Sequence, residues 1–353
     1  MKHRFFRLLA QVALFSISPL SHADTVSLTG AGSSAAKLVY QAWGERFTEQ
    51  TGIKFDYDAV GSSEGIRRIL DRKVAFGASD VAPDAAMLAR EGLVLVPTVV
   101  TGAVPVVNLP ELRHVGIQLD GPTLADIFAG SIKRWNAPEI RVLNPGIALP
   151  DMAIRPVVRS DGSGTTFNFT DYLAKVSTSW RTRFGAANRI EWVEGVIAAK
   201  GSSGIVKAVQ GTPGSIGYVD YSYVLRDSLQ TVALRNQAAR FVSPTLDTFR
   251  SALIASSWHA RGEFTSTLTN MPGADSWPIT MGTFVLLPKT VSSDADGSAP
   301  VRFFLWAFMN GDALAANANF VRLPDPVQAK AYRALSSIHD TSGKPLAYEA
   351  LSR

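Results

Sequence analysis

Along the chain, short β-type runs are followed by segments in which apolar positions recur at helical spacing. This pattern predicts strands followed by helices. Residues 26–29 form a short β-type run, and the apolar positions of residues 36–47 then recur at helical spacing. The order repeats when a β-rich segment at 53–59 leads through a Gly-Ser turn into another helical pattern. A further strand at 74–79 ends at Asp80. Strands that alternate with helices predict an α/β lobe with a largely parallel sheet.

A long valine-rich stretch predicts a crossing into a second lobe. Residues 93–109 are apolar and contain Pro97, Gly102 and Pro105, which favours a pair of extended segments over a helix. Short helices and strands alternate again after this stretch, and a return crossing is expected near residues 277–283. The helical patterns in the last part of the chain should then pack on the first lobe.

The length of the chain supports two lobes. About 330 residues follow the N-terminal leader described below, which exceeds the roughly 250–300 residues that usually share one core. We expect lobe I to comprise residues 24–103 and 281–353, and lobe II residues 104–280, joined by a two-strand hinge. The space between two lobes is a favoured place for a small ligand.

The first 23 residues have the pattern of a secretory signal. Three basic residues precede an apolar run from Leu8 to Leu20, and residues 21–23 supply a small-x-Ala cleavage site before Asp24. The run is shorter than the roughly 20 residues that span a bilayer, so we expect cleavage and a soluble product. The chain has no cysteine, which argues against disulfides and against a lipid anchor. Without the leader the charge is near neutral, and no nucleic-acid or membrane-surface partner is expected.

Four turns share one chemistry, and each precedes a predicted helix. They are GAGSS (30–34), GSS (61–63), DGSGT (161–165) and KGSSG (200–204). Glycine lets the backbone approach a ligand, the first-turn amides of a helix point outward, and the helix dipole favours an anion there. Ser and Thr hydroxyls add donors without adding charge. Since Ser or Thr at a helix start is usually only an N-cap, the hypothesis is that several turns converge on one anion.

Charged residues beside these turns make the hypothesis more specific. Arg159 can bind two oxygens of an oxyanion at once, and Asp161 can hold its guanidinium group. The alternative is a surface ion pair in which Asp161 is an N-cap. Asp80 would repel an anion unless the anion brings a proton, as monohydrogen phosphate does and sulfate does not. The alternative for Asp80 is a strand-end cap.

Two motifs leave enzymatic alternatives open. GSSEG at 61–65 matches the G-x-S-x-G nucleophile elbow of serine hydrolases, with His114, His259 and His339 as candidate bases. GAGSSA at 30–35 satisfies the looser dinucleotide fingerprint, although an exported protein rarely meets a nicotinamide cofactor. The chain has no Walker A lysine motif, no HExxH and no paired His/Cys metal spacing. Neither a cofactor nor a metal is expected.

Taken together, the motifs resemble the substrate-binding protein of the phosphate ABC transporter, the PstS type. They follow one another as in that family: LTGAGSS (28–34), VGSSEGIRRIL (60–70), FGASD (76–80), VVRSDGSGTTFNFTDYLAKV (157–176), GSIGYVDYSY (214–223) and DSWPIT (275–280). The resemblance implies a type II-like periplasmic binding protein, not an enzyme, that closes on phosphate and delivers it to a membrane ABC permease. We expect a monomer. Bulk uptake, sensing, a secretion-linked role and arsenate binding are all compatible with these motifs.

The resemblance also implies a ligand set. In the family the first turn supplies a hydroxyl and an amide, carried here by Ser34 and by the amide of Ala35, where the family commonly has Thr and Phe. The remaining family ligands match Ser62, Asp80, Arg159, Ser163, Gly164 and Thr165, and Asp161 matches the acid that pairs with the arginine. Residues 190–204 depart from the more glycine-rich stretch of related proteins, so the fourth turn is left out of the predicted site.

Overall fold

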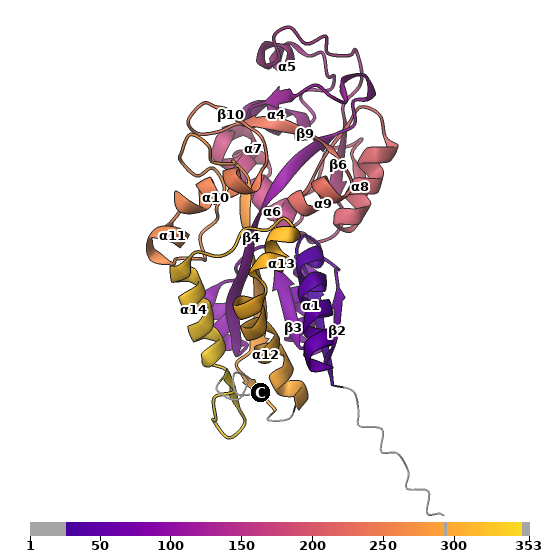
Figure 1. Ribbon diagram of the computed structural model, residues 1–353. Helices are drawn as coiled ribbons and strands as arrows, with labels where there is room; N and C mark the ends of the chain where they lie inside the picture. The colour runs from indigo at the N-terminus through magenta and orange to yellow at the C-terminus, as the bar shows by residue number, and fades with distance from the viewer. Residues whose placement is uncertain (1–25, 293–294, 348–353) are drawn as a thin grey trace, which may run out of the picture.

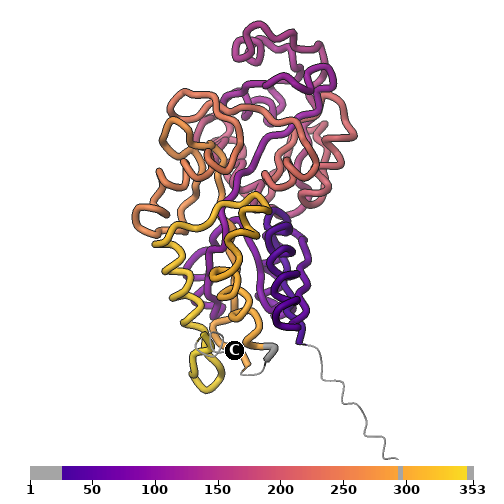
Figure 2. Tube along the Cα trace, viewed as in Figure 1, coloured from indigo at the N-terminus to yellow at the C-terminus, as the bar shows by residue number. Residues whose placement is uncertain are grey.

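The structure, a computed structural model, describes residues 26–292 and 295–347. The predicted leader, residues 1–23, lies outside this part of the chain. Figure 1 shows two lobes connected by long strands, among them β4. Figure 2 shows the chain running from the first lobe into the second and returning to the first. The predicted α/β class and two-lobed arrangement are confirmed.

The first lobe is built on parallel strands. β1 (Ser27–Gly32) pairs in parallel with both β2 (Lys54–Asp58) and β3 (Phe76–Ser79). β11 (Thr280–Pro288) lies antiparallel between β3 and β4 (Leu93–Val107). The other elements from these parts of the chain are α1 (Lys37–Thr51), α2 (Ser62–Leu70), α3 (Ala85–Arg90), β12 (Thr290–Val291), α12 (Ala295–Asn310), α13 (Asp312–Asn317), α14 (Asp325–Ser336) and β13 (His339–Asp340).

The second lobe continues the same sheet beyond β4. β8 (Ser215–Asp220) pairs antiparallel with β4 and parallel with β6 (Arg155–Arg159), which pairs in parallel with β7 (Ile197–Ala199). β9 (Gln230–Arg235) pairs with the end of β4 and with two short strands. The remaining elements between β4 and β11 are the 3-10 helix η1 (Pro110–Leu112), β5 (Ile117–Leu119), α4 (Gly121–Phe128), α5 (Pro138–Leu143), α6 (Gly164–Val176), α7 (Thr178–Arg183), α8 (Gly201–Gly211), α9 (Tyr221–Arg226), β10 (Phe241–Val242), α10 (Leu246–Ile254) and α11 (Ser257–Arg261).

β4 links the two lobes as one continuous strand. Residues 93–102 pair with β11, and residues 103–107 pair with β8. The predicted pair of extended segments is therefore wrong in one respect, because a single strand runs through both prolines. The register with β11 skips Thr98, since Thr283 pairs with Val99 and Phe284 pairs with Pro97, so a bulge lies directly beside Pro97. The predicted lobe limits stay a prediction, and the change of partner in β4 falls close to them.

Aromatic side chains fill the core of the first lobe. Tyr40 of α1 lies 6.1 Å from Phe76 of β3 and 6.2 Å from Phe304 of α12, between ring centroids. Phe303 of α12 stacks on Phe55 at 4.8 Å. The C-terminal helical segment thus packs on the first lobe, as its pattern predicted. Within residues 26–292 and 295–347, no helix combines the length and the apolar character needed to cross a membrane.

Candidate anion-binding site

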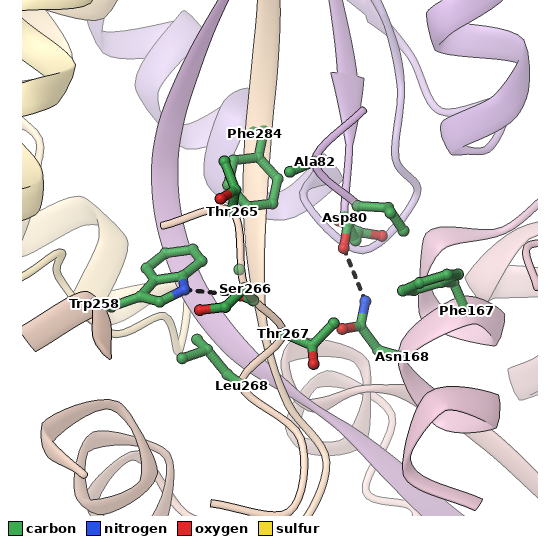
Figure 3. Close-up of a pocket in the computed structure, with 12 residues that line it drawn as sticks. Asp80, Ala82, Phe167, Asn168, Trp258, Thr265, Ser266, Thr267, Leu268 and Phe284 are labelled. Carbon is green, nitrogen blue, oxygen red and sulfur yellow. Dashed lines mark hydrogen bonds between the residues drawn. The ribbon is translucent and has the colours of Figure 1, made fainter. Parts of the chain in front are cut away.

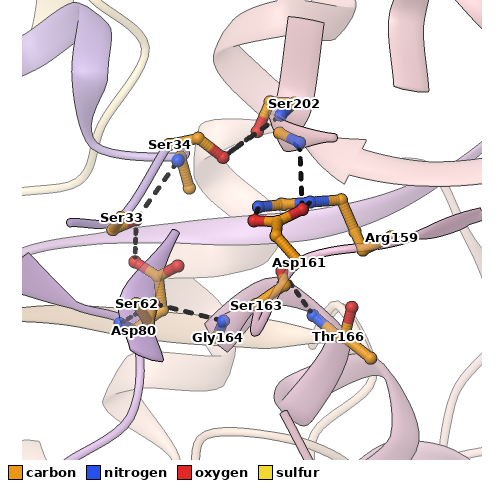
Figure 4. A network of polar contacts seen from close by, with 12 residues as sticks. Ser33, Ser34, Ser62, Asp80, Arg159, Asp161, Ser163, Gly164, Thr166 and Ser202 are labelled. Carbon is orange, nitrogen blue, oxygen red and sulfur yellow. Dashed lines mark hydrogen bonds and ion pairs between the residues drawn. The ribbon is translucent and has the colours of Figure 1, made fainter. Parts of the chain in front are cut away.

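The predicted site residues meet where the two lobes face each other (Figure 4). From the first lobe come Ser34 after β1, Ser62 at the start of α2 and Asp80 directly after β3. From the second lobe come Arg159 at the end of β6 and residues 163–165 at the start of α6. All of these residues are buried. Elements separated by about a hundred residues in sequence therefore enclose one polar site.

Ser62 joins the two lobes directly. Its Oγ accepts from the amide of Asp80 at 3.2 Å and from the amide of Gly164 at 3.1 Å. A Cβ on Gly164 would lie 2.6 Å from Ser62 Oγ and 2.7 Å from Asp80 Cβ, so only glycine fits at this position. Because Ser62 Oγ accepts two hydrogen bonds, its own O–H is left to donate, either to the Asp80 carboxylate or to a ligand.

The start of α6 offers hydroxyl donors. Ser163 caps the helix, and its Oγ accepts from the amide of Thr166 at 3.1 Å. The cap and a ligand role are compatible, because capping uses the oxygen as acceptor and leaves the O–H free to donate. Thr165 Oγ1 is buried and has no hydrogen-bond partner among the described residues. A buried unpaired hydroxyl is costly unless a ligand satisfies it.

Arg159 and Asp161 form a buried ion pair. Arg159 Nε donates to Asp161 Oδ1 at 2.7 Å, and a second Arg159 nitrogen contacts the other carboxylate oxygen. The amide of Gly201 also donates to Asp161 Oδ1, at 3.0 Å. Burial acts to raise the pKa of Asp161, but the hydrogen bonds and charge of Arg159 outweigh it and lower the pKa. The predicted pairing is thus present, and it fixes the guanidinium inside the site rather than on the surface.

Asp80 is a carboxylate 3% exposed to solvent. Its Oδ1 accepts from Ser33 Oγ at 2.6 Å and from Thr283 Oγ1 at 2.9 Å. Asn168 Nδ2 of α6 donates to the Asp80 main-chain oxygen at 2.8 Å, which links Asp80 to the second lobe. Burial raises the pKa of Asp80, although the hydroxyl donors and the charge of Arg159 act against this rise.

The first Gly-rich turn contacts the second lobe through Ser34. The amide of Ser202 donates to Ser34 Oγ at 3.1 Å, and the two hydroxyls lie 2.9 Å apart. Tyr223 Oη donates to the Ser34 main-chain oxygen at 3.1 Å. The amide of Ala35, a predicted ligand, donates to Ser33 Oγ at 3.2 Å. The turn at 200–204, which was left out of the predicted site, lies beside it, because the amides of Gly201 and Ser202 donate to Asp161 and Ser34.

Sequence reasoning missed four residues that support this site. Ser33 lies in a motif that was recognised, but the neighbouring Ser34 was chosen. Thr283 and Tyr223 lie in the hinge strand and in the GSIGYVDYSY motif, and no local pattern separates them from core residues. Asn168 lies one turn along α6 from Gly164, a spacing that places both on one helix face. That spacing is the signal that could have identified it.

The serine hydrolase alternative receives no support. No described histidine hydrogen-bonds to Ser62 or Ser63, and His114 and His259 are exposed. His339 lies in the β12–β13 pair. A nucleophile without a base within hydrogen-bond reach cannot be activated in the way this motif requires. No group of three or more His, Cys, Asp or Glu side chains suited to a metal occurs in the described part of the chain.

A cavity of about 90 Å³ adjoins Asp80 (Figure 3). Figure 3 shows Phe167 and Asn168 of α6 on one side and Phe284 on another, with the segment 265–268 between them. Asp80 is the one charged residue that lines the cavity, and the remaining lining is apolar or neutral. Because the lining has no cation, this cavity does not suit an anion. Arg159 and the hydroxyl donors at the start of α6 lie outside the lining of this cavity.

Residues 20–278 match the model of the PBP superfamily domain. The two-lobed fold and this match place the chain in the PBP superfamily of binding proteins. The phosphate-binding protein PstS of Haemophilus influenzae is 38% identical over 314 residues, which cover 89% of this chain and 94% of that protein. The PstS of Pasteurella multocida is 40% identical and covers 90% of this chain and 92% of its own length. The chain belongs to the family of PstS phosphate-binding proteins.

Solved structures show the same fold. A high affinity periplasmic phosphate-binding protein (PfluDING) bound with phosphate has a TM-score of 0.68 at 23% identity, covering 87% of this chain and 93% of that chain. A phosphate-binding protein from Stenotrophomonas maltophilia has a TM-score of 0.63 at 20% identity, with the same two coverages. At these identities the likeness concerns the fold.

Proposed function

We propose that this protein binds inorganic phosphate between its lobes and delivers it to a membrane ABC permease. PstS phosphate-binding proteins align with nearly the whole chain, which supports the choice of ligand. The enclosed set of hydrogen-bond donors around one arginine supports binding without chemistry. Because the family consists of binding proteins rather than enzymes, we assign the chain no catalytic residue and no cofactor.

The proposed ligand set is the one predicted from the sequence. Neutral donors and one cation surround the anion, so that its charge is met mainly by dipoles. The proposed phosphate ligands are Ser34, Ala35, Ser62, Asp80, Arg159, Ser163, Gly164 and Thr165. Asp161 supports the site by holding Arg159. On binding, the phosphate oxygens would exchange their hydrogen bonds to water for hydrogen bonds to these fixed donors.

The position of Asp80 carries the proposal. A buried carboxylate surrounded by donors repels an anion that has no proton. Monohydrogen phosphate can donate its O–H to Asp80 while its remaining oxygens accept from Arg159 and from the start of α6. Sulfate is fully ionised near neutral pH and has no proton to donate. The site should therefore bind phosphate and discriminate against sulfate.

Calorimetry on refolded, phosphate-stripped protein tests the proposal. We expect phosphate to bind with a Kd of about 1 μM or tighter, and sulfate to bind far more weakly under the same conditions. Arsenate, which has nearly the same shape and protonation as phosphate, belongs in the same titration series as a second protonated anion. Absence of phosphate binding, or equal affinity for sulfate, would contradict the proposal.

We also propose the cellular setting predicted from the sequence. The protein is exported to the periplasm, residues 1–23 are removed, and the mature monomer consists of lobe I (24–103 and 281–353) and lobe II (104–280). β4 and β11 supply the two strands on which the lobes would close. N-terminal sequencing of protein from a periplasmic extract should give Asp24 as the first residue. A product that retains residues 1–23 would contradict cleavage.

A further inference from the structure

Two hydroxyl donors converge on a single oxygen of the Asp80 carboxylate. Ser33 Oγ lies 2.6 Å and Thr283 Oγ1 lies 2.9 Å from Asp80 Oδ1. Both donor residues are completely buried. Figure 4 shows the oxygen beside Ser33 and the second oxygen turned away from it. Oδ2 accepts from neither of these two hydroxyls, so it is the carboxylate oxygen that can accept a proton from a ligand.

The orientation of the Ser33 hydroxyl and the main-chain position of Thr283 are both fixed by hydrogen bonds. Ser33 Oγ accepts from the amides of Ala35 at 3.2 Å and Ala36 at 3.3 Å, so its O–H is left to donate to Asp80. Thr283 lies in β11, and its main-chain oxygen accepts from Thr98 Oγ1 of β4 at 3.0 Å. A donor fixed in advance favours the ionised form of a carboxylate, because no reorganisation is needed when the charge is present.

We propose that Ser33 and Thr283 determine anion specificity by holding Asp80 as a carboxylate, with Oδ1 occupied and Oδ2 free for the ligand. In this arrangement Asp80 can only accept a proton, so the bound anion must carry one. A protonated Asp80 could instead donate to sulfate, and discrimination would fall. The inference rests on the proposed phosphate function and extends it to two residues outside the ligand set.

The surroundings of Asp80 explain why hydroxyl donors are needed to keep it ionised. Burial raises the pKa of Asp80, while the Ser33, Thr283 and Ser62 hydroxyls and the charge of Arg159 act to lower it. The other titratable groups that face Asp80 are Tyr40 of α1, Tyr57 of β2 and Asp220 at the end of β8. Burial raises the pKa of both tyrosines, so they stay neutral, and an ionised Asp220 would oppose charge on Asp80. Removing one donor should therefore favour the protonated acid.

The test compares Thr283→Val with Thr283→Ser, which keeps the hydroxyl. Phosphate and sulfate affinities are measured by calorimetry on stripped protein at several values between about pH 5.5 and about pH 8, a range in which a carboxyl of raised pKa can titrate. Asp80→Asn serves as a reference, because its side chain is uncharged and can donate a hydrogen bond to the anion. Thr170→Val is the matched control, because Thr170 is a buried α6 threonine whose hydroxyl bonds to Phe167 and Ala187 instead.

Near pH 6 we expect the ratio of phosphate affinity to sulfate affinity to be about tenfold lower in Thr283→Val than in the parent protein. This is roughly the effect of one hydrogen bond to a charged group. The pH at which discrimination declines should move upward, because a carboxyl that has lost a hydrogen-bond donor becomes protonated at a higher pH. Thr283→Ser and Thr170→Val should retain the ratio and pH profile of the parent protein. A structural defect alone would weaken both anions equally and leave the ratio unchanged.

Three outcomes separate the inference from the proposed function. Failure of the parent protein to bind phosphate would overturn both. A selective parent with an equally selective Thr283→Val across the pH range would overturn the inference alone, as would equal weakening of both anions. If Thr283→Val does not fold, Ser33→Ala provides the same comparison. Its control is Ser215→Ala, which removes a buried hydroxyl that donates to Val209 instead.

Discussion

Arg159 illustrates how a single residue is adapted to a buried site. A guanidinium group without a partner would be costly to bury, and Asp161 offsets its charge with two contacts. Asp161 is held in turn by the amide of Gly201, from the turn that begins α8. Two segments of the second lobe, residues 159–161 and the turn at Gly201, thus fix the direction of one cation.

Replacing Arg159 by alanine should weaken phosphate binding by about 2–5 kcal/mol, the usual cost of truncating one member of a buried charged pair. The variant also leaves Asp161 without its partner, which adds a negative charge near the anion. Calorimetry measures the loss. Arg155→Ala, an exposed arginine on the same strand, is the control and should bind phosphate as the parent protein does. Unchanged affinity in Arg159→Ala would remove Arg159 from the ligand set.

Asp220 is a second buried carboxylate, close to β4. Thr101 Oγ1 donates to its Oδ2 at 2.8 Å, and the amide of Ser222 donates to its Oδ1 at 2.9 Å. Burial nevertheless outweighs these hydrogen bonds and raises the pKa of Asp220 to about 7. In the unfolded chain the Asp220 carboxyl loses its proton near pH 4. Between about pH 4 and about pH 7 the carboxyl is therefore protonated in the folded protein and ionised in the unfolded chain.

This difference predicts a pH-dependent effect of Asp220→Asn on stability. The contribution of Asp220 to the free energy of unfolding should fall as pH rises from about 4 to about 7, and stay constant above that. Relative to the parent, the Asn variant should therefore gain about 2–3 kcal/mol between about pH 5 and about pH 8. Urea unfolding at the two pH values measures the gain. A difference that does not vary with pH would show that Asp220 has no raised pKa.

At the scale of elements, the position of α2 depends on one glycine. A Cβ on Gly65 would lie 2.4 Å from Gly32 Cα and 2.7 Å from the Ala31 main-chain oxygen, so the helix contacts β1 without a side chain between them. This close contact brings Ser62, in the first turn of α2, to the site. The packing of the helix and the placement of a ligand residue therefore have the same cause.

We expect Gly65→Ala to destabilise the fold by about 1–3 kcal/mol, because overpacking outweighs the roughly 1 kcal/mol that alanine gains over glycine in a helix. Phosphate affinity should fall as well, since α2 must move. Gly211→Ala is the control: Gly211 ends α8, and a Cβ there meets nothing within 4 Å. Urea unfolding and calorimetry measure the two effects. If Gly65→Ala changed neither the free energy of unfolding nor the phosphate affinity, the sheet would be able to move to make room for the added Cβ at no energetic cost.

Most elements were predictable from local pattern, and the departure in β4 depends on pairing with a distant strand. α1 ends at Thr51 before Gly52, which adopts the left-handed conformation expected after a helix. β4 was predicted as two segments because proline normally interrupts a sheet. A bulge beside Pro97 allows one strand instead, and a bulge depends on the partner strand β11, which lies far away in sequence.

At the scale of the whole molecule, contacts between the lobes gather around the first Gly-rich turn. Ser34 meets Ser202 through its hydroxyl and Tyr223 through its main-chain oxygen. The Ser63 amide donates to the Gly162 oxygen at 3.1 Å, close to Ser62. These bonds join the two lobes, so under the proposed mechanism of lobe closure they would stabilise the closed arrangement.

Tyr223→Phe removes one of these bonds and should speed the release of phosphate. We expect dissociation to be about three- to tenfold faster, the effect of a hydrogen bond worth about 1 kcal/mol, with little change in association. Stopped-flow measurement with a labelled protein separates the two rates. Tyr172→Phe is the control, because the buried Tyr172 hydroxyl has no partner among the described residues. Equal dissociation rates would show that the Tyr223 bond does not contribute to closure.

The sequence by itself determined the order of strands and helices, the Gly, Ser and Thr turns before the helices, and the pairing of Arg159 with Asp161. These features depend on residues close together in the chain, where period, turn chemistry and spacing act directly. Only the tertiary structure decided that Ser202 meets Ser34 and that Thr283 meets Asp80. Those contacts join segments separated by 168 and 203 residues. They depend on how the sheet pairs and how the lobes face each other, which no local pattern records.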